Sequence, residues 1–326
     1  MKLAYTIIAC AMSLCTSTAY AADFTCEGKS FTFFPGGSEG DSFASIVYGG
    51  AKLASQHTGC DVDYVWSNWD PQKMVQQFSE AIARKPTGIA IMGHPGDEAL
   101  DPLIDQARAA GIVVTVSNVA LPSAEKKYKS EGLGFVGPEA LQSGRTLGEA
   151  AVKSCGLKSG DKAFVWGLLG QAGRGQRTQG VLDALKDAGV QTEYLEISDA
   201  VNGDAAQGIP IFASFAASHP DLKAVITDHG ALTATLPAYM KAAGKKPGEI
   251  CGAGFDLSSA IVSGLKDGAI SVVLDQQPFL QGYLSVLQLY MTSKFGFAGL
   301  HVDTGAALIT KDNVDALAPL AAEAIR

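Results

Sequence analysis

The sequence predicts an α/β protein made of two similar lobes, each with a parallel sheet between layers of helices. Short apolar runs of strand length alternate with helix-length stretches along most of the chain, as in repeated strand-helix-strand units. This pattern restarts near residues 133–137. A chain of 326 residues is also long enough for two domains with separate cores. We therefore expect two Rossmann-like lobes with short connections between them.

The N-terminal residues predict an export signal that is removed. Lys2 precedes the mostly apolar stretch 3–15, and Ala19-Tyr20-Ala21 places small residues at both positions that a signal peptidase reads. The apolar run is shorter than the roughly 20 residues needed to span a bilayer. We assign residues 1–21 as a cleaved signal peptide. Residues 7–10 resemble a lipoprotein cleavage box, but too few residues precede Cys10 for a working signal.

The first half of the mature chain contains alternating strand and helix candidates. The predicted strands are 31–36, 61–67, 87–93 and 112–118. The predicted helices are 43–58, 71–85 and 98–111. Apolar residues recur at three- and four-residue spacing in the first of these helices, and Pro71 suits the first turn of the second.

The second half repeats the alternation. Its predicted strands are 162–167, 191–198, 222–230, 250–256 and 270–277. Its predicted helices are 178–189, 209–219, 231–244 and 258–268. Ligands of open parallel sheets bind at the carboxyl ends of the strands, so the loops after these strands are where we look for a site.

Four cysteines remain after removal of the signal: Cys26, Cys60, Cys155 and Cys251. An even number in an exported protein suggests two disulfides, for which three connectivities exist. Each cysteine stands near the start of a predicted strand, and adjacent parallel strands would bring such starts together. We expect Cys26–Cys60 and Cys155–Cys251, with buried free thiols as the alternative. The spacing matches no zinc pattern.

Several function classes lack support in the sequence. The formal net charge of −8 disfavours binding to nucleic acid. Gly170, Gly173 and Gly175 follow a predicted strand, but Thr178 stands where a dinucleotide fingerprint needs its next glycine. The five histidines form no metal-binding pair, and no nucleophile elbow is present. We expect no metal, no cofactor and no enzymatic activity.

Residues 225–256 (VITDHGALTATLPAYMKAAGKKPGEICGAGFD) and 263–283 (SGLKDGAISVVLDQQPFLQGY) carry a more specific pattern, in which GFD and QQP follow strands at a set separation. This pattern resembles the ribose-binding branch of the type I periplasmic binding proteins. VGPEALQSGRTLGEAA, residues 136–151, resembles that family's entry into its second lobe. The resemblance implies crossing hinge segments between lobes. We assign 22–131 plus 277–303 to lobe 1 and 132–276 plus 304–326 to lobe 2.

The resemblance also implies a sugar site between the lobes. A sugar needs amides and carboxylates for its hydroxyls, an arginine fork, and aromatic planes for its C–H faces. Candidate ligand-binding residues lie at or just after the ends of predicted strands: Asp41, Phe43, Trp69, Asn118, Trp166, Arg177, Asp228, His229, Asp256 and Gln276. Of the two tryptophans, we expect one to reach the ligand.

Each candidate has a structural alternative. Asp41 and Asp228 would also suit helix caps, Phe43 a helix core, Asn118 a turn, and Arg177 a solvated helix surface. His229 has the weakest support, and Asp256 and Gln276 have the strongest. Related sugar binders often carry Asp-Arg where this chain has Asn118-Val119, and Asn-Asp where it has Asp228-His229. These differences do not favour ribose over a different pentose, a hexose or a polyol, and we expect the ligand to be one of these small polyhydroxylated molecules.

The resulting hypothesis is a periplasmic, monomeric solute-binding component of an ABC importer, which delivers a small sugar or polyol to a membrane permease. The alternative with the same fold is a sensory protein that delivers a sugar-like signal to a membrane receptor. An enzyme on this fold has no supporting motif. A related repressor would carry a DNA-binding helix-turn-helix where this chain has an export signal.

Overall fold

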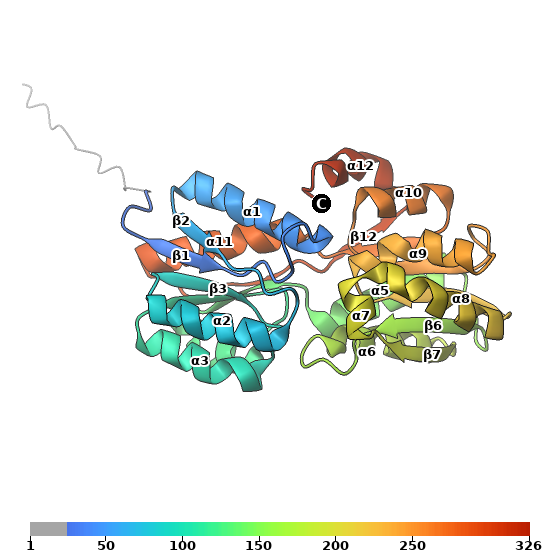
Figure 1. Cartoon of the computed structure of the whole chain (residues 1–326), viewed down its shortest axis with the longest axis horizontal. Coiled ribbons are helices and arrows are strands. Elements are labelled where there is room, and N and C mark those ends of the chain that lie inside the picture. The colour runs from blue at the N-terminus through green and yellow to red at the C-terminus, as the bar shows by residue number, and fades with distance from the viewer. Residues whose placement is uncertain (1–24) are drawn as a thin grey trace, which may run out of the picture.

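A computed structural model describes residues 25–326, so the predicted signal peptide, residues 1–21, lies outside the described residues. The chain forms two α/β lobes side by side (Figure 1), which confirms the predicted fold class. Among residues 25–326, none of the helices combines the length and apolarity that a membrane span requires.

Lobe 1 is built on a parallel sheet in the order β11-β5-β4-β3-β1-β2. Its strands are β1 (Ser30–Phe33), β2 (Asp61–Tyr64), β3 (Gly88–Met92), β4 (Val113–Ser117), β5 (Gly134–Gly137) and β11 (His301–Asp303). Its helices are α1 (Ser42–Thr58), α2 (Pro71–Arg84), α3 (Asp97–Ala109), α4 (Pro122–Tyr128), the 3₁₀ turn η1 (Lys129–Glu131) and α11 (Pro278–Phe295). Helices α1 and α11 cover one face of the sheet, and α2 and α3 cover the other (Figure 1).

Lobe 2 repeats this arrangement in the order β12-β10-β9-β8-β6-β7, but its edge strand β12 runs antiparallel to β10. Its strands are β6 (Lys162–Gly167), β7 (Gln191–Glu196), β8 (Leu222–Thr227), β9 (Cys251–Phe255), β10 (Val272–Asp275) and β12 (Ala307–Thr310). Its helices are α5 (Ala140–Ser154), α6 (Gly175–Asp187), α7 (Asp199–Gly203), η2 (Ala205–Gly208), α8 (Ile209–Ser218), α9 (Gly230–Ala242), α10 (Ser259–Asp267) and α12 (Val314–Ala322).

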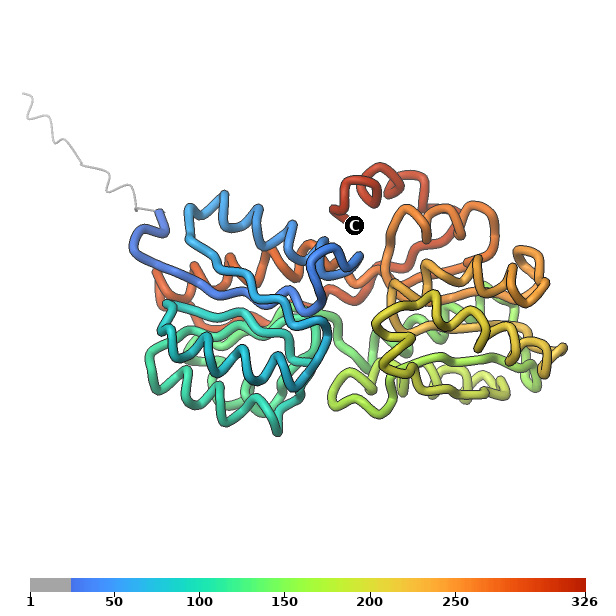
Figure 2. Tube along the Cα trace, viewed as in Figure 1, coloured from blue at the N-terminus to red at the C-terminus, as the bar shows by residue number. Residues whose placement is uncertain are grey.

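Three chain segments cross between the lobes, after β5, after β10 and after β11, near the middle of the trace in Figure 2. Thr304 N donates to Gly137 O at 3.0 Å, so the first and third crossings are tied together. The first crossing comes later than the assigned boundary at residue 131, because β5 pairs with β4 and belongs to the first sheet. From sequence alone, the buried run GFVG of β5 is interpreted as the start of the second lobe.

Close helix contacts set the geometry of the strand-end loops. A Cβ on Gly144 of α5 would lie 1.9 Å from the backbone oxygen of Arg177, and one on Gly180 of α6 would lie 2.2 Å from that of Leu141. The two glycines therefore let α5 and α6 touch along their backbones. This contact holds the start of α6, and with it Arg177, against the sheet.

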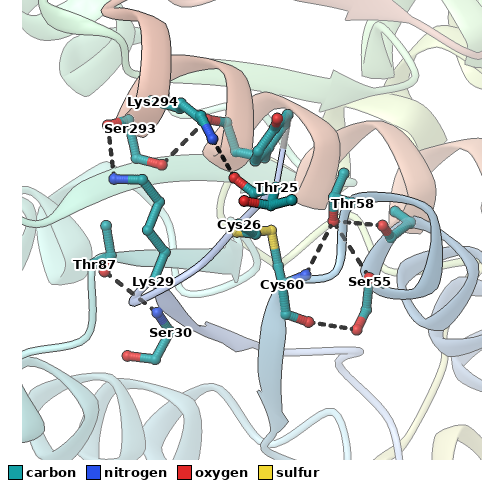
Figure 3. The surroundings of a disulfide bond; sticks show 12 residues. Thr25, Cys26, Lys29, Ser30, Ser55, Thr58, Cys60, Thr87, Ser293 and Lys294 are labelled. Carbon is teal, nitrogen blue, oxygen red and sulfur yellow. Dashed lines mark hydrogen bonds between the residues drawn. A yellow bond between two sulfur atoms is a disulfide. The ribbon is translucent and has the colours of Figure 1, made fainter. Parts of the chain in front are cut away.

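Both predicted disulfides are present, which confirms the expected pairing. Cys26–Cys60 spans 34 residues within lobe 1, and Cys155–Cys251 spans 96 residues within lobe 2. Figure 3 shows that the first disulfide lies beside α11, where Lys29 Nζ donates to Ser293 O at 3.1 Å. The disulfide and this hydrogen bond attach the first described residues to the end of α1 and to the end of α11.

Candidate functional site

A polar cavity lies between the lobes at the carboxyl ends of both sheets. It is lined by eight of the ten predicted ligand-binding residues: Asp41, Phe43, Trp69, Asn118, Arg177, His229, Asp256 and Gln276. The space open to water-molecule centres is about 60 Å³. This exceeds the minimum of about 10–15 Å³ that a cavity needs for one water, so the cavity has room for water or a small ligand.

The wall from lobe 1 is mostly aromatic. Trp69 follows β2, and its ring centroid lies 5.8 Å from that of Phe43 and 5.3 Å from that of His94. Asp41 fixes this wall in two ways: Oδ1 accepts hydrogen bonds from the Phe43 and Ala44 amides and caps α1, while Oδ2 accepts one from Trp69 Nε1 at 3.2 Å. The expected cap and the expected site residue are therefore the same side chain.

The wall from lobe 2 is charged. Asp228, at the end of β8, is buried and accepts hydrogen bonds from Arg177 Nη2 at 3.2 Å, from Thr178 Oγ1 at 3.0 Å and from Arg174 Nη2. The Arg177 guanidinium also lies 4.2 Å from the centroid of the Phe255 ring. Two arginines on one buried carboxylate form a network whose donors are held in place before any ligand arrives.

Gln276 joins the two lobes at the crossing after β10. Its Oε1 accepts hydrogen bonds from Arg177 Nη1 at 3.0 Å and from Asn118 Nδ2 at 3.2 Å, and its Nε2 donates to Asp256 Oδ1 at 2.7 Å. Asp256 also accepts one from the Gly230 amide at 2.9 Å. One amide side chain thus contacts one residue of lobe 1 and two of lobe 2.

The backbone at the cavity adopts the left-handed conformation at several residues other than glycine. The φ angles are 57° at Trp69, 61° at Asn118, 73° at Asp256 and 54° at Gln277. Such conformations each cost on the order of 1 kcal/mol or more and cluster where side chains must be aimed at a ligand. All four residues follow strands that end at the cavity.

Burial and the two arginines control ionisation in this site. Burial opposes ionisation of Asp228, but the charges of Arg177 and Arg174 outweigh it and lower the pKa of its carboxyl. Burial raises the pKa of Asp256 to about 6, although the Arg177 charge and the Gln276 hydrogen bond work against this. Burial also lowers the pKa of Arg174 to about 10, and the Arg177 charge adds to this effect. Asp228 is therefore the permanent counter-ion, while Asp256 titrates near neutral pH.

Two histidines face the cavity from opposite lobes. Burial lowers the pKa of His229 to about 3 and holds that of His94 well below its usual range, and the Arg174 charge lowers both further. Within residues 25–326, both ring nitrogens of His94 and Nε2 of His229 are buried without a hydrogen-bond partner, as is Arg174 Nε. These four nitrogens are therefore unpaired polar atoms that belong to residues lining the cavity.

Two predicted residues are not at the cavity surface. Trp166 is in the core of lobe 2, with 1% exposure, and its ring lies 5.6 Å from Phe164 and 5.5 Å from Tyr239. Its expected ligand contact is not supported, because this side chain packs in the core against Phe164 of β6 and Tyr239 of α9. Asp228 lies behind the two arginines rather than on the cavity lining. Of the two tryptophans, Trp69 lines the cavity.

Sequence reasoning missed five polar lining residues: Ser42, His94, Gln171, Arg174 and Asn202. His94 follows β3 and could have been found by the strand-end rule that selected the others. Arg174 lies three residues before Arg177 and places a second guanidinium at the site from lobe 2. A Cβ on Gly173 would lie 2.9 Å from Val119 Cγ1, so the loop that carries Arg174 packs on Val119, where related sugar binders often have arginine.

A family model described as a periplasmic binding protein domain matches residues 31–295, which is most of the chain. The chain belongs to this family. This confirms the resemblance seen in the sequence.

Curated relatives with similar sequences are named as sugar-binding proteins. The xylose/arabinose-binding protein XylF of Sulfolobus acidocaldarius is 28% identical over 78% of this chain and 65% of its own length. The D-ribose/D-allose-binding protein of Pseudomonas aeruginosa is 31% identical over 57% of each chain. This chain thus spans less than two thirds of the length of these two relatives.

Solved structures share the fold. A carbohydrate transporter from Acidothermus cellulolyticus in complex with myo-inositol has a TM-score of 0.77 at 24% identity, over 91% of this chain and 99% of that one. An ABC transporter solute-binding protein from Burkholderia graminis in complex with D-arabinose has a TM-score of 0.76 at 24% identity, over 88% and 96%. Both likenesses support the two-lobed architecture.

Proposed function

We propose that the protein is the periplasmic solute-binding component of an ABC importer, and that it binds one monosaccharide or polyol between its lobes. The cavity itself is the observation that carries this proposal. It has room for a small ligand, an aromatic wall on one side and a charged hydrogen-bonding wall on the other. Sugars present apolar C–H faces and many hydroxyls, and this combination meets both.

The unpaired nitrogens favour a ligand that supplies hydrogen bonds. Arg174 Nε, both ring nitrogens of His94 and Nε2 of His229 are buried without partners in the described chain, and leaving such groups unpaired costs about 1–3 kcal/mol each. A polyhydroxylated molecule can donate to a neutral imidazole nitrogen and accept from the arginine. The buried charges, two arginines against Asp228 and Asp256, are balanced, which suits a neutral ligand.

Closure of the lobes on the ligand would link occupancy to delivery. The candidate residues divide between the lobes, with Phe43, Trp69 and His94 on one side and the two arginines and Asp256 on the other. A ligand that contacts both walls stabilises the closed form only through this double contact. A membrane permease that recognises the closed form would then accept only the protein that carries a ligand. Because residues of one chain form both walls of the cavity, we also propose that the protein acts as a monomer.

Mass spectrometry of small molecules released from the purified protein tests this function, followed by thermal-shift titration with D-xylose, L-arabinose, D-ribose, D-allose, D-apiose and myo-inositol. A sugar that binds only the folded state stabilises it by about 4 kcal/mol at a concentration about 1,000-fold above its Kd.

Arg177→Ala should remove most of this gain, because the variant takes a guanidinium donor away from the ligand, while Asp228 keeps its bonds from Arg174 and Thr178. Asp221→Ala breaks an exposed ion pair with Lys162 at the opposite end of the sheet and should leave the gain unchanged. If no sugar or polyol shifts the melting temperature of the parent protein, the proposed function is wrong.

A further inference from the structure

The crossing between β10 and α11 contains a buried carboxylate. Asp275, the last residue of β10, has a fully buried side chain. Its Oδ1 accepts a hydrogen bond from the backbone N–H of Gln277 at 2.8 Å, and its Oδ2 accepts one from Arg326 Nε at 2.8 Å. The Arg326 side chain is 23% exposed, so this ion pair is largely removed from water.

The position of this carboxylate links it to the sugar cavity. Gln276 follows directly in the chain and carries the amide that contacts Asn118, Arg177 and Asp256. Gln277 then adopts the left-handed conformation, and α11 begins at Pro278. Any rotation of the backbone at Asp275 or Gln277 would therefore turn the Gln276 amide away from its three partners.

Arg326 reaches this crossing from a distant part of the chain. It follows α12, which lies against α10 in lobe 2, and the end of the chain marked C in Figure 1 lies over the middle of the molecule. Its guanidinium supplies the positive charge that a buried carboxylate needs, since removing one partner of a buried ion pair leaves an uncompensated charge. With its charge balanced in this way, the Asp275 carboxylate can keep its hydrogen bond with the backbone N–H of Gln277.

We propose that Arg326 is a positioning residue of the cleft: through Asp275 it fixes the crossing 275–278 and so aims the Gln276 amide into the cavity. Arg326 does not line the cavity and touches no ligand. The part of this inference that concerns the crossing stands without the proposed function, and the part that concerns sugar affinity rests on it.

Hydrogen exchange of the mature full-length protein, without added sugar, tests the crossing. In Arg326→Ala the backbone amide proton of Gln277 should exchange about tenfold faster or more, because its hydrogen bond to the Asp275 carboxylate is lost or weakened. Arg326→Lys should restore most of the protection. Lys266→Ala is the matched control: it breaks the exposed ion pair between α10 and Asp315 of α12 and should leave Gln277 unaffected.

The double variant Arg326→Ala with Asp275→Asn separates a charge effect from a packing effect. Asparagine keeps an oxygen for the Gln277 amide but carries no charge, so protection should return toward that of the parent. If Arg326 only docks α12, the Gln277 backbone amide will exchange as fast in the double variant as in Arg326→Ala. In that case Lys266→Ala will also speed exchange at Gln277. Either of these results overturns the proposal, as does unchanged exchange in Arg326→Ala.

Titration calorimetry with D-ribose as the probe adds the second readout. Where the parent binds D-ribose, Arg326→Ala should weaken its Kd by about tenfold, with recovery in the double variant. Unchanged affinity in Arg326→Ala, with faster exchange at Gln277, overturns the link from the crossing to the cavity. If the parent does not bind D-ribose, that result bears on the ligand, whereas the exchange data still decide the role of Arg326.

Discussion

Lobe 1 faces the cavity with the rings of Phe43, Trp69 and His94, whereas lobe 2 faces it with two arginines on a buried aspartate. The rings lie on one another and need no counter-charge. The ionic network depends on Asp228 above all, because its removal leaves two buried guanidinium groups without their shared counter-ion. The same sheet architecture therefore supports two kinds of wall: an aromatic wall whose members can be removed at little cost in stability, and an ionic wall whose stability depends on its buried counter-ion.

Removal of either disulfide should produce the largest loss of stability, and the loss should be confined to the lobe that contained the disulfide. Chain-entropy arguments give about 4 kcal/mol for the loop closed by Cys26–Cys60 and about 5 kcal/mol for the longer loop closed by Cys155–Cys251. Hydrogen exchange of the paired Cys→Ser variants should show faster opening in the lobe that lost its disulfide. A loss spread evenly over both lobes would contradict the picture of two separate cores.

Asp228→Ala should destabilise lobe 2 by about 3–5 kcal/mol, because Arg174 and Arg177 would remain buried without their counter-ion. Chemical denaturation followed by circular dichroism measures the loss. Asp221→Ala, which removes an exposed carboxylate from the same lobe, is the control and should have little effect. If the two variants are equally stable, the network is not what holds this wall together.

The two candidate tryptophans provide a matched pair. Trp166→Ala should cost about 3–5 kcal/mol of unfolding free energy, since it empties a position in the core of lobe 2 beside Tyr239 of α9. Trp69→Ala should cost much less stability, because the half-buried ring faces the cavity, and should instead weaken binding of the sugar identified by thermal shift. Calorimetry and denaturation on both variants compare the effects. The reverse pattern would place the ligand elsewhere.

Asp256 should give a smaller, pH-dependent effect. Burial raises its folded-state pKa to about 6, above the value of about 4 in an unfolded chain. The ionised group therefore costs stability, and this cost is absent below pH 4, grows as the pH rises from about 4 to 6, and is complete above that range. Relative to Asp256→Asn, the parent should lose up to about 3 kcal/mol across this window. Denaturation at pH 4 and pH 8 measures the difference, and a pH-independent difference would contradict the raised pKa.

Much of the fold and part of the site could be predicted from sequence. Alternating strand and helix lengths indicated both lobes, and the strand-end rule found Asp41, Trp69, Asn118 and Asp256. The rule could not separate Trp69 from Trp166. Trp166 lies inside β6, where successive side chains alternate between the two faces of the sheet, and it shares a face with Phe164. Periodicity shows that neighbours face opposite ways, but not which face meets the cavity.

The local sequence by itself determined the elements, the even set of cysteines and the polar ends of the strands, because propensity and hydrophobic period act over a few residues. Tertiary structure decided what meets across the chain. It placed β5 in the first sheet, brought Arg174 to Asp228 over a separation of 54 residues, and joined Arg326 to Asp275 over 51. Such pairings depend on sheet order and on which helices pack together, so these two ion pairs can be identified only in the folded chain.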